Sequence, residues 1–150
     1  MILDDAAHAN LLRRLRSLLL GVLVFGALGL GAELTRVEHW DGPVQWVPLG
    51  LLGVIAVASV GIWAHPLPVA VKLFRGLMVV TLLAGCFGGL LHFRTNAIQE
   101  REQDPTISGA TLVDAALSGR APTLAPGALI QLALLGLVAV YRHPGLERPT

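Results

Sequence analysis

Four long apolar runs separated by short polar segments dominate this chain of 150 residues. They cover residues 17–34, 44–64, 76–91 and 124–141, and charge, proline or an aromatic residue bounds each one. No run carries the polar stripe that a helix of a water-soluble bundle needs. Because a bilayer core of about 30 Å requires about 20 helical residues, the runs predict four transmembrane helices.

This pattern predicts an all-α membrane protein, with four transmembrane helices in an antiparallel bundle and one domain over residues 1–150. The longest connection, residues 94–122, is too short and too polar to bury a core of its own. Within it, residues 112–117 predict a short amphipathic helix on the periplasmic side. We expect Thr106 or Ser108 to cap this helix and Ser118-Gly119 to end it.

Composition supports a membrane environment. Hydrophobic residues make up 54% of the chain and charged residues 14%, whereas soluble domains carry roughly 25% charged residues. The single cysteine, Cys86, lies inside an apolar run, so a disulfide framework and a CxxC metal motif are both excluded. We expect it to act as a small packing residue.

The distribution of basic residues predicts the topology. Seven of the eleven Lys and Arg residues fall on the side of the two termini: Arg13, Arg14, Arg16, Lys72, Arg75, Arg142 and Arg148. The other four fall on the opposite side, where most of the acidic residues also lie. The positive-inside rule therefore predicts a multi-pass protein with both termini in the cytoplasm. We expect the membrane to be a bacterial inner membrane.

The N-terminal region could also be interpreted as a secretory signal, because a basic stretch precedes an apolar run and small residues. Two aspartates and a histidine before the basic cluster are unusual for such a signal, so we expect no cleavage. We expect Asp4 or Asp5 to be the N-cap of an interfacial helix that runs into the first span.

Polar residues gather at the predicted outer rim of the bundle. If the third helix continues past the membrane surface, His92, Asn96 and Glu100 recur at intervals of four and share one helix face. Glu33 closes the first span on the same side and His39 follows in the outer loop. Gln45 and Gln131 lie about one turn inside the other two helices. We therefore expect all four helices to place a polar group at one depth.

This rim has two interpretations. Gln, Asn and His commonly form hydrogen bonds between membrane helices, so the residues can be a structural network in which Gln45 and Gln131 take part. Alternatively, Glu33, His39, His92, Asn96 and Glu100 can hold a divalent metal cation, since imidazole and carboxylate groups suit such ions. Haem is disfavoured, because His92 lies at the outer end whereas His65 and His143 lie at the inner one.

Glycines recur along the runs and predict close contacts between helices or a face for a partner, because small residues let helix backbones approach each other in lipid. They are Gly21, Gly26, Gly29, Gly31, Gly50, Gly53, Gly61, Gly76, Gly85, Gly88, Gly89 and Gly136. The expected partners are the lipid bilayer and other membrane subunits, or a second copy of the chain.

Three segments carry a resemblance: residues 91–100, residues 121–127 and Tyr141-Arg142-His143-Pro144. In these segments the chain resembles a group of small bacterial four-helix membrane proteins without an assigned function. The resemblance implies one helical membrane domain and carries over no catalytic residue.

Enzymatic function has no support in the motifs. The chain lacks a GxSxG sequence, a P-loop and a zincin motif. A net charge of +1 without a basic patch away from the predicted membrane ends excludes a typical nucleic-acid binder. We therefore expect an accessory or scaffold subunit that associates laterally with an inner-membrane complex. The alternative is a periplasm-facing protein that binds a metal cation or a cofactor at the outer rim.

Overall fold

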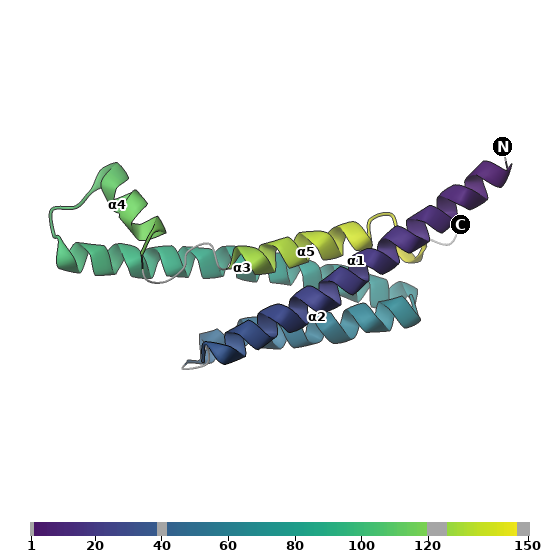
Figure 1. Ribbon diagram of the computed structural model, residues 1–150, viewed down its shortest axis with the longest axis horizontal. Helices are drawn as coiled ribbons and strands as arrows, with labels where there is room; N and C mark the ends of the chain where they lie inside the picture. Colours follow the sequence, from purple (N-terminus) through teal and green to yellow (C-terminus); the bar gives the residue numbers. More distant parts are fainter. Residues whose placement is uncertain (1, 39–41, 120–125, 147–150) are drawn as a thin grey trace. The chain divides into compact units, whose positions relative to one another are not determined.

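The structure is a computed structural model that describes residues 2–38, 42–119 and 126–146 (Figure 1). Every regular element in these ranges is helical. The long helices are α1 (Ile2–Arg36), α2 (Trp46–Ala64) and α3 (Pro68–Gln103), and the shorter ones are α4 (Gly109–Leu117) and α5 (Gly127–Ala139). Two single 3₁₀ turns, η1 (Pro43–Gln45) and η2 (Pro144–Leu146), complete the described elements.

Three helical stretches are long and apolar enough to cross a membrane: Ala6–Arg36, Pro43–Ala64 and Pro68–Gln103. They contain the first three predicted runs, so this part of the fold prediction is confirmed. The fourth run forms α5, whose 13 residues extend over about 20 Å at 1.5 Å per residue. That is shorter than a bilayer core of about 30 Å, and residues 124 and 125 of this run lie outside the described ranges. Four complete spans therefore stay a prediction.

One helix boundary differs from the predictions and another agrees with them. Helix α1 already begins at Ile2, so Asp4 and Asp5 lie inside the helix and neither is its N-cap. Because the helix is continuous to Arg36, the basic segment and the first apolar run form one rod. Helix α3 does continue past its apolar run, as the spacing of the rim residues required.

The chain divides into two compact units. The first unit contains Met1–Val80 and Leu132–Thr150, and the second contains Thr81–Gln131. Helices α3 and α5 therefore contribute residues to both units, while α1 and α2 belong to the first and α4 to the second. The prediction of a single domain over residues 1–150 stays a prediction.

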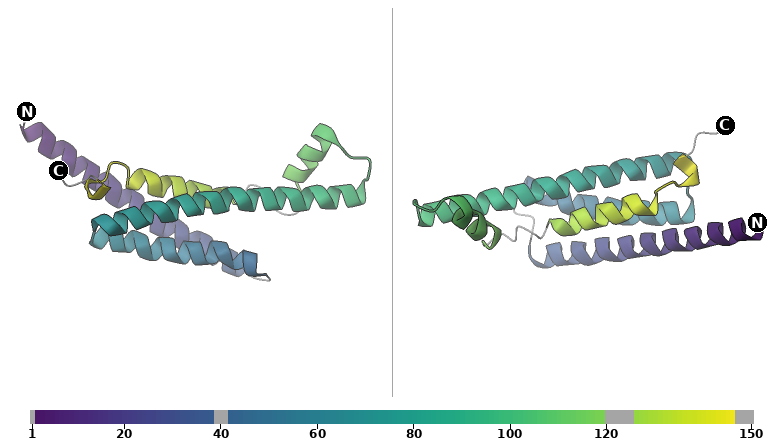
Figure 2. Two further views of the ribbon diagram at one scale, coloured as in Figure 1. Left: turned by 180° about the vertical axis from the view of Figure 1, so that it is seen from behind. Right: turned by 90° about the horizontal axis from the view of Figure 1, so that it is seen from above.

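In the first unit, α1 and α2 lie side by side (Figure 2). The packed face of α2 carries Leu52, Ile55, Ser59 and Ile62 at intervals of three and four residues, the spacing of one helix face. Ser59 is fully buried, and its hydroxyl has no hydrogen-bond partner among the described residues. On α1 the buried residues are Leu20, Leu23 and Ala27.

Two glycines of the first unit lie where helices approach closely. A Cβ atom on Gly26 of α1 would lie 2.7 Å from a methyl carbon of Leu132 in α5. A Cβ atom on Gly136 of α5 would collide with the Met78 side chain of α3. Helix α5 thus contacts both α1 and α3 closely at glycine positions, where a larger residue would displace the Leu132 or Met78 side chain.

In the second unit, α3 and the start of α5 make a similar contact. A Cβ atom on Gly85 would lie 2.7 Å from the Ile130 side chain and 3.2 Å from the Pro126 carbonyl oxygen. A Cβ atom on Gly88 would lie 3.3 Å from Pro126. Close packing thus explains these two glycines and the two of the first unit.

Other glycines of the apolar runs do not lie at internal contacts. A Cβ atom would meet nothing within 4 Å at Gly21, Gly29, Gly31, Gly50, Gly53, Gly61 and Gly76. These positions make no close contact among the described residues, and the alternative expectation, a face for a partner, stays a prediction. Cys86 differs from its prediction as a packing residue, because its side chain is exposed.

Candidate functional site

Asn96 is the polar rim residue with the clearest structural role. Its side chain is fully buried, and its amide Nδ2 donates a hydrogen bond of 2.9 Å to the carbonyl oxygen of Ala116. Ala116 lies in the last turn of α4. Asn96 thus joins α4 to α3 within the second unit.

Gly119 completes this contact. A Cβ atom at Gly119 would lie 2.5 Å from Asn96 Cγ and 2.8 Å from Asn96 Nδ2. The chain leaving α4 can therefore pass over the Asn96 amide only because residue 119 has no side chain. The short amphipathic helix itself is confirmed, with Leu112 and Ala116 as its buried residues and Ser108 at the N-cap position. The Ser108 side chain makes no capping hydrogen bond.

The other rim residues are less enclosed. His92 and Glu100 are half-buried and lie on the same face of α3 as Asn96, so the predicted stripe forms within the second unit. Gln131, at the end of that unit, is exposed. In the first unit Glu33 is exposed and Gln45 is half-buried. The Gln45 Oε1 atom has no hydrogen-bond partner among the described residues. His39 lies outside the described ranges.

A metal site at this rim stays a prediction. Across residues 2–38, 42–119 and 126–146, no group of three or more His, Cys, Asp and Glu side chains is placed to hold a metal ion. Glu33 belongs to the first unit, whereas His92, Asn96 and Glu100 belong to the second. Asn96 already uses its amide to bind Ala116, which favours the structural interpretation for that residue.

A tight turn follows α3. The main-chain N–H of Thr106 and its hydroxyl both donate to Asp104 Oδ1, over 2.9 and 2.6 Å. Both hydrogen bonds lower the pKa of Asp104 below its ordinary value, and the one from the hydroxyl has the larger effect. The carboxylate therefore stabilises the turn that leads from α3 towards α4.

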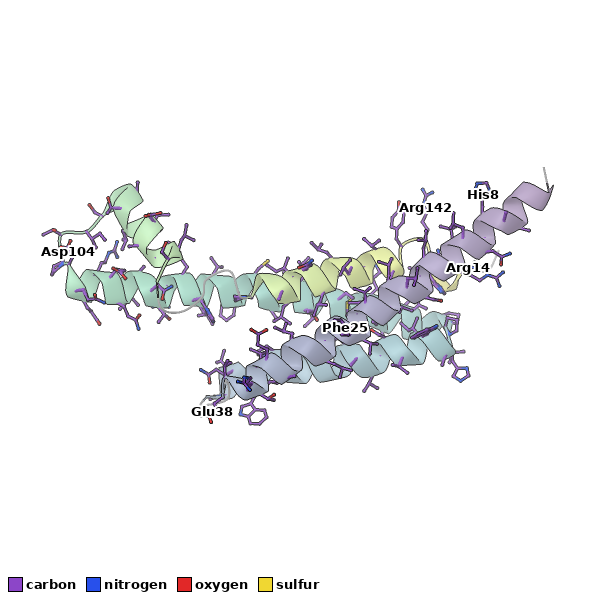
Figure 3. All side chains as sticks on the ribbon, in the orientation of Figure 1. His8, Arg14, Phe25, Glu38, Asp104 and Arg142 are labelled. Carbon is purple, nitrogen blue, oxygen red and sulfur yellow. The ribbon has the colours of Figure 1, made fainter. Side chains whose placement is uncertain are left out.

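A basic cluster lies at one end of the first unit. We define it as Arg13, Arg14, Arg16, Arg75 and Arg142, which come from α1, from α3 and from the segment after α5. In Figure 3, Arg14 and Arg142 lie towards one end of this unit and Glu38 lies at the other. The two ends of the unit thus differ in charge.

Arg16 links α1 to the end of α5. Its guanidinium donates hydrogen bonds to the carbonyl oxygens of Arg142, at 3.0 Å, and of Tyr141, at 3.3 Å. Arg142 has a φ of 44°, in the left-handed region that side chains rarely adopt. The guanidinium thus satisfies carbonyl groups of a helix end that departs from regular geometry.

A pocket of about 590 Å³ adjoins this helix end, and its lining includes Arg75, Tyr141 and His143. Partial burial and, to a smaller extent, the positive charge of Arg16 lower the pKa of His143. His143 is therefore mainly neutral near neutral pH. From the sequence we placed His143 only at the predicted inner end of the bundle, together with His65. The basic residues pointed to the charge at this end, but nothing in their spacing indicated the pairing of Arg16 with residues 141 and 142.

Comparisons with known proteins add no assignment. No protein-family model, curated protein or solved structure matches the chain. The resemblance to small bacterial four-helix membrane proteins therefore stays a prediction.

Proposed function

We propose that this protein is a non-enzymatic integral membrane protein of a bacterial inner membrane, and that it acts as an accessory or scaffold subunit. It associates laterally with another membrane protein through the outward face of α2. The observation that carries this proposal is the division of α2 into two opposite faces, one packed against the rest of the first unit and one open.

The open face of α2 contains Gly50, Val54, Val57 and Gly61. Their spacing of four, three and four residues places them on one side of a helix that turns 100° per residue. The packed face, with Ile55 and Ser59 at its centre, lies about half a turn away. Val57 is 75% exposed, and a Cβ atom on Gly50 or Gly61 would meet nothing within 4 Å. We name these four residues the outer α2 face.

This composition suits contact with another transmembrane helix. Lipid tails are as apolar as leucine, so helices associate in a bilayer by close packing rather than by the hydrophobic effect. Glycines with a turn or more between them let two backbones approach, and a valine between them fills the contact. Residues that faced lipid alone would gain nothing from being glycine, which also costs about 1 kcal/mol relative to alanine in a helix.

The basic cluster supports the proposed orientation. Arg16, from the start of the chain, donates to carbonyls of residues 141 and 142 near its end. Both terminal regions then belong to one side of the membrane, and the positive-inside rule makes that side the cytoplasm. In this proposal residues 124–141 provide the fourth crossing, with α5 as its helical part.

Co-purification tests the proposed association. Tagged wild type and a Gly50→Leu/Gly61→Leu variant are extracted gently from membranes and compared by native mass spectrometry. The wild type is expected to retain a stoichiometric membrane-protein partner or a second copy, and the variant to lose it. Gly76→Leu is the matched control, because Gly76 also opens onto free space but lies on α3.

The same preparation addresses the alternative function. Elemental analysis of the wild type would find stoichiometric metal if the rim residues formed a cation site. A wild type that carries metal and loses it in His92→Gln, with no protein partner in either sample, would replace the present proposal.

A further inference from the structure

A groove on the first unit combines an apolar floor with two guanidinium groups. It has a volume of about 650 Å³ and lies between α1 and the end of α2. Leu18, Val22 and Phe25 of α1 line its length, and Trp63 of α2 contributes to its wall. Arg13 and Arg14 line the end of the groove opposite to Phe25. Every lining residue belongs to the first unit.

The shape of the groove depends on Gly21. This residue lines the groove halfway along, and a Cβ atom there would meet nothing within 4 Å. The missing side chain leaves a depression in the surface of α1. On either side of it, Leu18 and Phe25 are 66% and 80% exposed. The depression is therefore walled by apolar groups that the rest of the first unit does not cover.

The length of the groove matches one leaflet of a bilayer. Arg13 and Phe25 are twelve residues apart, which is about 18 Å along a helix. Half of a bilayer hydrocarbon core is about 15 Å. Trp63 lies at the end of α2, and such aromatic rings favour the membrane interface. With Arg13 and Arg14 at headgroup level, the apolar part of the groove reaches towards the middle of the membrane.

The charge at the mouth selects the kind of lipid. Arg13 donates to the side-chain oxygen of Asn10, which is neutral, so this bond adds no negative charge to compensate the guanidinium. Arg14 is the next residue and is exposed. Two guanidinium groups form strong charge-assisted hydrogen bonds with a phosphate, and basic pockets of this kind bind anionic headgroups on the cytoplasmic side.

We infer that this groove binds an anionic phospholipid of the cytoplasmic leaflet. The phosphate accepts hydrogen bonds from Arg13 and Arg14, and one acyl chain lies over Gly21 between Leu18 and Phe25. The inference is independent of the outer α2 face, because the groove is formed chiefly by α1.

Native mass spectrometry of the full chain tests this inference. The protein, purified in mild detergent, is mixed with phosphatidylglycerol or with phosphatidylcholine of the same acyl chains. We expect a retained phosphatidylglycerol adduct and about tenfold less phosphatidylcholine. The Arg13→Gln/Arg14→Gln variant should retain about tenfold less phosphatidylglycerol, because each basic residue near an anionic headgroup adds to the attraction.

A second variant keeps both charges. Gly21→Leu puts side-chain atoms into the depression, and its Cβ atom would meet nothing within 4 Å, so it should fold normally and lose the adduct. Gly29→Leu is the matched control on the same helix, since it also opens onto free space but does not line the groove. It should bind like wild type. Equal retention of both lipids by the wild type, or full retention by Gly21→Leu, would overturn the inference.

Discussion

The guanidinium of Arg16 donates a hydrogen bond of 3.0 Å to the main-chain carbonyl oxygen of Arg142. The two residues are 126 positions apart, so this bond ties the middle of α1 to the segment that follows α5. Two basic residues can be neighbours here because Arg16 binds the main-chain carbonyl of Arg142 and not its guanidinium.

Replacing Arg16 should loosen the end of α5. Hydrogen bonds to charged groups contribute about 1.5–3 kcal/mol to stability. Because the site is partly solvated, we expect Arg16→Gln to destabilise this helix end by about 1–2 kcal/mol. Hydrogen exchange should become faster at the last amides of α5 and stay unchanged in α4. Arg36→Gln removes the same charge from the exposed end of α1 and serves as the control. Equal effects of the two variants would show that the bond to Arg142 is unimportant.

His143 should titrate below an ordinary histidine, since burial first and the charge of Arg16 second lower its pKa. The unfolded chain then binds a proton more readily than the folded one. Stability is therefore complete above the ordinary histidine pKa of about 6.5 and falls as the pH is lowered through that value towards the folded pKa. Histidine NMR signals should show a higher pKa in Arg16→Gln. An unchanged pKa in that variant would exclude the electrostatic contribution.

Asn96 should hold α4 on α3. Asn96→Leu removes the hydrogen bond from the Asn96 amide to the Ala116 carbonyl oxygen, and the loss of such a bond costs about 0.5–1.5 kcal/mol. Amides of α4 should exchange faster while those of α1 keep their protection. Gly119→Ala should have a similar local effect, because its Cβ atom would overlap the Asn96 side chain. Gln99→Leu, at an exposed position of α3, is the control. Normal protection of α4 in Asn96→Leu would contradict this role.

Topology can be measured with reporter fusions at positions 41, 67, 108 and 150. The basic bias predicts that positions 67 and 150 face the cytoplasm and that positions 41 and 108 face the periplasm. A periplasmic position 150 would mean that the segment containing α5 does not complete a crossing. The short length of α5 makes this fusion the most informative of the four.

The apolar runs predicted the helices well, because runs of this length and uniform hydropathy, in a chain with so little charge, are typical of membrane helices. Helix boundaries were less predictable. Asp4 and Asp5 are good capping residues, yet a continuous helix starts before them. The fourth run is as apolar as the others, but its helix ends at Ala139, and the turn after it depends on Arg16, far away in sequence.

The polar residues were predictable as a group and not in their roles. The spacing of His92, Asn96 and Glu100 correctly indicated one face of α3. It could not indicate that the partner of Asn96 is a main-chain carbonyl, because carbonyl acceptors leave no trace in the sequence. For the same reason glycines at contacts, such as Gly136, and glycines in open space, such as Gly50, look identical before the helices are assembled.

The most direct test of the proposed lateral association is photo-crosslinking in intact membranes. A photoreactive residue at Val57, in the centre of the outer α2 face, should yield one discrete protein adduct. The same group at Leu73, which is 70% exposed on α3, controls for random encounters and should yield mainly lipid adducts. A protein adduct at Val57 that disappears in Gly50→Leu/Gly61→Leu is the predicted result. Only lipid adducts at Val57 would contradict the account.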